Sequence, residues 1–315
     1  MSFEIPDRVP LLREGIRDDV IKEWREQGLL PDENLEDIFH YDQREEIEPD
    51  LTPLPALNIW PTSRNSLAQY KNHLNPDDPA RLPADWEEKV RDWREREHIL
   101  ILRLHRGFFQ SMGVDEWGRF HEVIELLKDD PEFLREMMKV QSEFAVLIAE
   151  KILRDVQVDA ILISEPISSN RGPLISPAMY RDLVLNSYEP VLDTVERFGV
   201  KVIILRTYAN SRVLLPSIVN TRINCLWACE CETDAMDYGS IRSEYGEDLR
   251  LIGGVDTDIL RSDKQRIQHE LEDKIPPLLE SGGYLPLADG RIRSEIPYNN
   301  YIYYRRLLEQ ITSSI

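Results

Sequence analysis

The stretch AILISE at residues 160–165 decides the fold, because it is an apolar run that ends on a charged residue and the same pattern recurs along the chain. The other runs are ILILRLH at 99–105, VIILRTY at 202–208, CLWACE at 225–230, LRLIGGVD at 249–256 and YLPLAD at 284–289. Amphipathic helical stretches separate most of them. A strand that is buried on both faces has no solvent side to make polar, so the pattern predicts a parallel sheet with helices over both faces.

Length and composition favour one closed barrel over two independent domains. A TIM (β/α)8 barrel typically takes about 250 residues, and the chain has 315 with no Gly/Ser-rich linker. We expect residues 98–315 to form the main part of the barrel and residues 1–97 to form an irregular, Pro-rich extension packed on it, in which LNIW at 57–60 supplies a first strand. The eighth strand is inferred from closure. An open doubly wound sheet is the alternative, although the chain has no GxGxxG or Walker-type loop.

Capping residues mark where the helices begin. An N-capping side chain followed by proline is typical of a helix N-terminus, and it opens two helices predicted over residues 131–155 and 177–198. Ser262 and Gln265 have the spacing of a capping box and open a third helix, which the Pro-Pro pair at 276–277 and Gly282 should end.

The charge of the chain disfavours negatively charged macromolecular partners. The formal net charge is −20 and the pI is near 4.8, so the overall field repels nucleic acid and anionic membranes. No apolar stretch reaches the roughly 18 residues that span a bilayer, and the opening MSFEIPDRVP lacks the features of a signal peptide. We therefore expect a cytoplasmic protein with no nucleic-acid or membrane partner. A homodimer is compatible with the sequence.

All three cysteines, Cys225, Cys229 and Cys231, lie in one predicted strand, where odd positions share a face. A zinc site is one interpretation. Three ligands on one extended strand cannot readily surround a metal tetrahedrally, and no histidine is nearby in the sequence, so we predict no metal site and buried, hydrophobe-like thiols instead.

Polar residues at or after the apolar runs are the candidate site residues, because the carboxyl ends of barrel strands converge on one mouth. Three of them could move protons and are the catalytic candidates: Glu165, Tyr208 and Asp289. The others are substrate-binding candidates: His105, Ser169, Arg206, Asn210, Asp256, Arg291 and Arg293.

Several of these residues also have a purely structural interpretation. Ser169 can satisfy loop backbone groups, Asp256 can cap a short helix, and His105 can be a hydrogen-bonded core imidazole. Arg206 follows four aliphatic residues, and a buried cation without a partner is costly. Its partner is either an internal carboxylate, such as Glu165 or Glu230, or an anionic substrate.

Four segments, in this order, resemble the uroporphyrinogen decarboxylase superfamily, which also contains cobalamin-dependent and related methyltransferases. They begin with GPLISPAMYRDLVLNSYEPVLDTVERFGVKVIIL and continue with ILRTYANSRVLLPSIV, GEDLRLIGGVDTDIL and GGYLPLADGRIRSEIPYNNYIYYRRLLE. The N-terminal PDRVPLLREGIRDDVIKEWREQGL is similar to the openings of divergent members. The resemblance implies a TIM barrel with its site at the C-terminal mouth.

The chain departs from the pattern of both branches. In the methyltransferase branch a His-x-Cys pair and a later Cys hold zinc, and the matching positions here are Arg206, Tyr208 and Gly290, none of which provides a thiolate or imidazole. In the decarboxylase branch the late loop carries a His where this chain has Gly290, and the arginine-rich N-terminal motif and the catalytic Asp have no counterpart. The serine before that branch's Gly-x-Leu turn falls near Ser169.

Three functions follow from these residues. The first is a metal-independent, cofactor-free decarboxylase-type enzyme (a carbon-carbon lyase) that acts on a small anionic, carboxylated molecule. Arg206, with Arg291 or Arg293, would hold the carboxylate, and Glu165, Tyr208 or Asp289 would handle protons. The second is a methyltransferase of the corrinoid-related branch without zinc-thiolate activation, for which a corrinoid would be the cofactor. The third is a non-catalytic ligand-binding relative.

Overall fold

The computed structural model describes residues 3–4, 8–231 and 234–314. The chain forms two compact units. The central unit comprises residues 44–207 and 213–224, and the terminal unit comprises residues 1–43, 208–212 and 225–315. In the described residues, seven parallel strands alternate with helices, as in a TIM-like barrel, which confirms the predicted α/β class.

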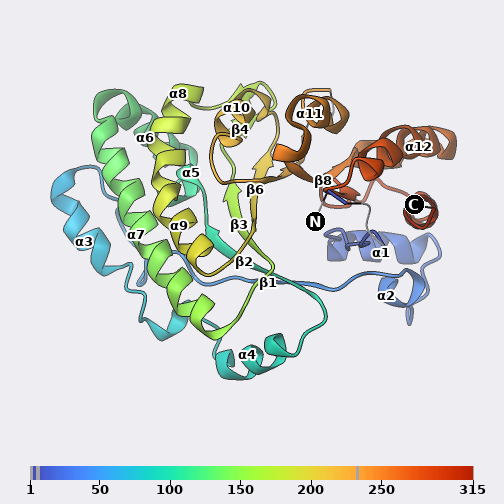
Figure 1. The fold of residues 1–315 in the computed structure, drawn as a ribbon, viewed down its shortest axis with the longest axis horizontal. Helices are drawn as coiled ribbons and strands as arrows, with labels where there is room; N and C mark the ends of the chain where they lie inside the picture. Colours follow the sequence, from blue (N-terminus) through green and yellow to red (C-terminus); the bar gives the residue numbers. More distant parts are fainter. Residues whose placement is uncertain (1–2, 5–7, 232–233, 315) are drawn as a thin grey trace. The chain divides into compact units, whose positions relative to one another are not determined.

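The central unit is a parallel sheet with helices packed on it. Its strands, in sheet order, are β1 (Arg44–Ile47), β2 (Ile99–His105), β3 (Ala160–Glu165) and β6 (Val202–Tyr208). Its helices are α3 (Leu67–Asn72), α4 (Trp86–Arg94), α5 (Phe108–Ser111), α6 (Trp117–Asp129), α7 (Pro131–Asp155), α8 (Pro177–Met179), α9 (Asn186–Arg197) and α10 (Leu215–Ile218). A π-helical turn over Tyr180–Leu185 joins α8 to α9, and a short hairpin of β4 (Ser168–Ser169) and β5 (Gly172–Pro173) follows β3. Figure 1 shows α7 and α9 side by side, and α7 also contacts β2.

The terminal unit contains three further parallel strands in the order β7 (Cys225–Cys229), β8 (Arg250–Val255) and β9 (Tyr284–Ala288). Its helices are α1 (Asp18–Glu26), α2 (Leu35–Ile38), α11 (Tyr238–Tyr245), α12 (Lys264–Glu280) and α13 (Tyr298–Thr312). Helix α12 packs against α13, and the N-terminal segment joins this unit through a parallel bridge between Ile16 and Ile292.

The apolar runs of the sequence all form strands. The strands β2, β3 and β6 coincide with the quoted segments residue for residue, and β7 and β9 end one residue earlier, before Glu230 and Asp289. The caps of two helices are also confirmed. Asp130 accepts a hydrogen bond from the backbone of Phe133 at the start of α7, and Ser176 accepts one from Met179 at the start of α8.

Two expectations about the chain's local structure are wrong. The segment LNIW at 57–60 is not a strand, and the first strand is instead Arg44–Ile47, within an acidic stretch. The third helix is capped by Asp263, not Ser262, and continues to Glu280 through the Pro-Pro pair at 276–277. These prolines do not end the helix, whereas Gly282, the other expected stop, directly follows its C-cap Ser281 and has φ of 70°.

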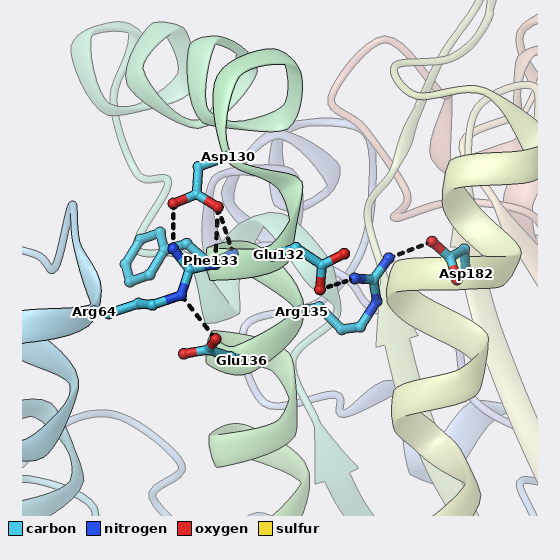
Figure 2. Close-up of polar contacts among 7 residues, drawn as sticks. All are labelled: Arg64, Asp130, Glu132, Phe133, Arg135, Glu136 and Asp182. Atoms are coloured by element: carbon cyan, nitrogen blue, oxygen red, sulfur yellow. Dashed lines mark hydrogen bonds and ion pairs between the residues drawn. The ribbon is translucent and has the colours of Figure 1, made fainter.

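Exposed ion pairs connect α7 to the segments on either side of it (Figure 2). Arg64 donates to both oxygens of Asp130, at 2.6 and 3.0 Å, and to Glu136 at 2.8 Å. Arg135 donates to Asp182 of the π-helical turn at 2.5 Å. Because these side chains are largely exposed, each ion pair adds little to the free energy of unfolding.

A buried charge pair holds the N-terminal segment to α13. Arg305 lies 3.3 Å from Glu14, and their side chains are 1% and 0% exposed. Tyr301 and Tyr304 also donate hydrogen bonds to Glu14 at 2.9 and 2.7 Å, so the carboxylate is fully engaged.

None of the helices in the described ranges is long and apolar enough to cross a membrane. The proposed boundary between an extension at residues 1–97 and a barrel at 98–315 stays a prediction.

Candidate functional site

The register of the central sheet decides which side chains share a face, because partner residues on parallel strands point the same way. Ser164 pairs with Arg206, and Glu165 pairs with Thr207. Arg206 and Glu165 therefore lie on opposite faces of the sheet. The expectation that these two side chains meet in one cavity is wrong.

The carboxylate next to Arg206 is that of Glu46 on β1, and not the expected Glu165 or Glu230. The Arg206 Nη1 and Glu46 Oε1 atoms are 4.0 Å apart, although β2 and β3 lie between the two strands in the sheet. Neighbouring strands lie about 4.8 Å apart, so a flat sheet would separate β1 from β6 by roughly 14 Å. The sheet must curl, with Arg206 and Glu46 on its concave face.

Two more arginines occupy this concave face. Arg44 Nη2 lies 3.9 Å from Glu46 Oε1, and Arg103, whose partner Leu162 has the orientation of Ser164, donates to Glu48 at 2.8 Å. We call Arg44, Arg103 and Arg206, with Glu46 and Glu48, the arginine face. It brings three guanidinium groups together on one face of a chain whose formal charge is −20. Partly buried guanidinium groups bind carboxylates in a planar, bidentate geometry.

Glu165 is fully buried on the opposite, helix-covered face. Its Oε1 accepts a hydrogen bond from the backbone of Phe108 at 2.9 Å, and its Oε2 accepts one from the Tyr188 hydroxyl on α9. Burial disfavours the ionised form and raises the pKa of Glu165 to about 7, while both hydrogen bonds act in the other direction. The carboxyl is thus poised to titrate near neutral pH, at a distance from solvent.

His105 belongs to the same buried layer. Its ring lies edge-on to Tyr188 with centroids 4.7 Å apart, and its Nδ1 accepts a hydrogen bond from the backbone of Gly107 at 3.0 Å. Burial and the nearby Arg106 lower the pKa of His105 to about 3, so the imidazole is neutral at pH 7. His105 lies in the core, but its Nε2 is buried without a hydrogen-bond partner in the part of the chain that the structure describes, so the contacts do not make it the fully hydrogen-bonded core imidazole.

Ser169 is occupied within its own hairpin. Its hydroxyl donates to the carbonyl of Gly172 at 3.0 Å and accepts from the backbone of Arg171 at 3.3 Å. These contacts order the β4–β5 turn, which is the structural role that such loop hydroxyls commonly have.

In the terminal unit, Asp289 organises the loops that follow β7, β8 and β9. Its Oδ1 accepts from the backbone and hydroxyl of Thr257, and its Oδ2 accepts from the backbone of Cys231 at 3.2 Å and from its thiol at 3.6 Å. Desolvation is the largest influence on Asp289 and raises its pKa. Both oxygens are engaged by protein groups, so Asp289 positions loops.

The neighbouring candidates Asp256 and Asn210 are engaged locally. Asp256 Oδ1 accepts from the backbone of Asp258 at 2.8 Å and so caps the short helix Thr257–Arg261. Asn210 Oδ1 accepts from the backbone of Arg212 at 3.2 Å. Tyr208 is the last residue of β6 and is half-buried.

Arg291 and Arg293 are exposed on either side of Ile292, which is buried and whose backbone donates to the carbonyl of Gly15 at 2.9 Å. The parallel bridge between Ile16 and Ile292 fixes the backbone of this segment, and the side chains of Arg291 and Arg293 are exposed to solvent.

Sequence reasoning missed Arg44, Glu46 and Arg103. The available signal was the alternation of REEI at 44–47, since the side chains of Arg44 and Glu46 share one face of a strand. A second missed feature is backbone strain at the ends of β6 and β7, where Ala209 and Glu230 have φ of 54° and 47°. Strained non-glycine residues cluster at functional sites.

The donor set does not fit the zinc of the methyltransferase branch. In the described ranges no three His, Cys, Asp or Glu side chains come close enough together to hold a metal ion. Cys231 has a raised pKa, first because it is buried and then because of Asp289, so its thiol is held in the protonated form.

The sequence pattern of the family "Uroporphyrinogen decarboxylase (URO-D)" matches residues 117–284. Solved structures similar to this chain include a methyltransferase from Methanosarcina mazei, with a TM-score of 0.61 and 15% sequence identity over 99% of this chain and 95% of that chain. No curated protein matches the sequence. Because the family pattern covers more than half of the chain and its strands and helices follow the expected order, the protein belongs to the uroporphyrinogen decarboxylase (URO-D) family.

Proposed function

We propose that this protein binds the carboxylate of a small molecule on the arginine face and removes it as CO2. The observation that carries this proposal is the gathering of Arg44, Arg103 and Arg206 on one concave face. A low-dielectric surface strengthens each charge interaction made there. Guanidinium groups bind carboxylates in a planar, bidentate geometry, so this face suits a carboxylated substrate.

Decarboxylation needs an anchored carboxylate and a proton. The bond between the carboxylate carbon and its neighbour breaks, its electron pair stays on the neighbouring carbon, CO2 leaves, and that carbon then takes a proton from an acid. Tyr208 is our proposed donor, because it follows Arg206 by two residues on β6 and so points to the same side of that strand. Water would then return a proton to the phenolate.

Methyl transfer is the second candidate, favoured by the methyltransferase similarity over nearly the whole chain. At 15% identity, that similarity shows a shared fold and does not by itself show a shared reaction. The acceptor would have to be activated without the zinc-thiolate arrangement, and a corrinoid would be the methyl carrier. A non-catalytic ligand-binding relative remains the third candidate.

A thermal-shift screen with porphyrins, corrinoids and small mono- and dicarboxylates separates these candidates, since a ligand that binds only the folded state raises the melting temperature. We expect carboxylates to stabilise the wild type, and Arg206→Met to lose the effect. The exposed Arg154→Met variant is the matched control and should keep it. The carboxylates that bind are then assayed for CO2 release. A corrinoid-only response would favour methyl transfer, and carboxylate binding without turnover would favour the non-catalytic relative.

A further inference from the structure

The end of β2 turns His105 toward the helix-covered side of the central sheet. Arg103 pairs with Leu162, whereas His105, two residues later, pairs with Ile163. Leu104 is thus an extra residue in the ladder, and such a β-bulge shifts the side-chain alternation by one. His105 therefore lies in the buried layer between strands and helices, where it is 2% exposed.

The hydrogen bond at Nδ1 determines which ring nitrogen of His105 carries the proton. The backbone N–H of Gly107 donates to Nδ1 at 3.0 Å, so Nδ1 has no hydrogen of its own. The ring is neutral, because burial and the nearby Arg106 lower the pKa of His105 to about 3. A neutral imidazole whose Nδ1 is an acceptor carries its proton on Nε2. Nε2 is therefore a hydrogen-bond donor.

This Nε2 donor is buried and has no acceptor among the residues that the structure describes. Leaving a buried donor unsatisfied costs its full desolvation penalty, and in folded proteins such groups bond to protein or to an internal water. His105, Tyr188 and Glu165 are each at most 2% exposed, so the acceptor has to be small. An ion without a charged partner would be costly in this layer, which favours water.

Tyr188 on α9 supplies a second polar group beside the imidazole. The two rings meet edge-on with their centroids 4.7 Å apart. The Tyr188 hydroxyl donates to Glu165 Oε2, and its oxygen can still accept a hydrogen bond. An internal water needs at least two polar partners. A water molecule that accepts from Nε2 and donates to the Tyr188 oxygen meets this requirement.

We propose an internal water site between β2 and α9, in which one buried water molecule accepts a hydrogen bond from His105 Nε2 and donates one to the Tyr188 oxygen. The water joins His105, Tyr188 and Glu165 in one chain of hydrogen bonds. It stabilises the proton on Nε2, so that Nδ1 stays available to the amide of Gly107 at the carboxyl end of β2. The site lies on the side of the sheet opposite Arg206 and is independent of the arginine face.

The first test observes the six histidines of the ¹⁵N-labelled wild type by long-range ¹H–¹⁵N NMR. His105 is assigned from the peaks that disappear in His105→Asn, whose amide oxygen can still accept from Gly107. At pH 7 we expect a neutral His105 ring with its proton on Nε2, and a rotating-frame Overhauser cross-peak between that proton and water. A proton on Nδ1, a charged ring or the loss of the water cross-peak would each overturn the proposal.

The second test locates the water in a high-resolution crystal structure of the wild type. We expect an ordered water about 3 Å from both His105 Nε2 and the Tyr188 oxygen. A direct hydrogen bond between Nε2 and the Tyr188 oxygen would overturn the proposal, as would an Nε2 atom surrounded by apolar atoms alone.

The third test removes the acceptor for the water with Tyr188→Phe. Tyr284→Phe is the matched control, because the buried Tyr284 hydroxyl donates to the Gly253 carbonyl at 2.9 Å in the terminal unit. We expect Tyr188→Phe to lose the water cross-peak of His105 and Tyr284→Phe to keep it. An unchanged cross-peak in folded Tyr188→Phe would refute the role of Tyr188. Both wild-type measurements decide the water site even if Tyr188→Phe does not fold.

Discussion

Arg206 on β6 lies 4.0 Å from Glu46 on β1 across two intervening strands. This pair shows that the central sheet is curled and that charged groups line its concave side. Glu46 also lies 3.9 Å from Arg44, so one carboxylate stands between two of the arginines that we propose bind the substrate. A bound anion would compete with Glu46 for the same guanidinium groups.

Replacing Glu46 with Gln should therefore strengthen anion binding. Removing the carboxylate raises the positive potential of the arginine face, and we expect a severalfold lower dissociation constant for the best carboxylate. The same change should lower the free energy of unfolding by about 1–3 kcal/mol, because Arg44 and Arg206 lose a charged partner. Calorimetric titration and urea unfolding measure the two effects. The exposed Glu125→Gln on α6 is the control, and equal or weaker anion binding in Glu46→Gln would contradict the assignment.

Glu165 should make the protein less stable as the pH rises through neutrality. Its pKa in the folded chain is about 7, against 4.5 ordinarily, so between these values the folded state binds more protons than the unfolded state. The free energy of unfolding then falls with increasing pH, by about 3 kcal/mol across this window. Glu165→Gln has no proton to lose. The difference between wild type and Glu165→Gln in urea unfolding should change between pH 5 and pH 8, and parallel pH curves would refute the raised pKa.

Gly107 and Gly199 form a matched pair for testing the close approach of the β2 loop. Both have positive φ, 83° and 79°, but a Cβ atom at Gly199 meets nothing within 4 Å, whereas one at Gly107 collides with the backbone of Ser164. Gly199→Ala should cost about 1–2 kcal/mol from its φ alone. Gly107→Ala should cost about 2 kcal/mol more. Equal losses of stability in thermal unfolding would show that the loop is not pressed against β3.

Removing one charge of the buried Glu14–Arg305 pair should destabilise the protein more than removing both charges. Arg305→Met leaves a fully buried carboxylate without its cation, and we expect a loss of about 3–5 kcal/mol in the free energy of unfolding. The double variant Glu14→Met with Arg305→Met removes both charges and should be more stable than Arg305→Met alone. If the double variant is the less stable of the two, Glu14 is stabilised chiefly by Tyr301 and Tyr304 and not by the charge pair.

The sequence predicted the strands that are buried on both faces, because a continuous apolar run is itself the mark of such a strand. It missed β1 for the same reason. In REEI the side chains of Arg44 and Glu46 face the charged concave side, so the strand has the composition of a solvated surface. The alternation of REEI was the one available signal, and over four residues it does not separate a strand from a solvated loop.

The site was predictable at Arg206 and less so elsewhere. A cation after four aliphatic residues requires a partner, and the structure supplies one in Glu46. The face on which Glu165 lies could not be read from the sequence, because it depends on the register of β3 and β6. The direction of His105 depends in addition on the bulge at Leu104, which cannot be predicted from the residue types.

A crystal structure with the best-binding carboxylate tests the central claim most directly. The account predicts a carboxylate oxygen within hydrogen-bonding distance of the Arg206 guanidinium group and at least one further contact from Arg44 or Arg103. A carboxylate bound elsewhere, with the pair of Arg206 and Glu46 undisturbed, would contradict it.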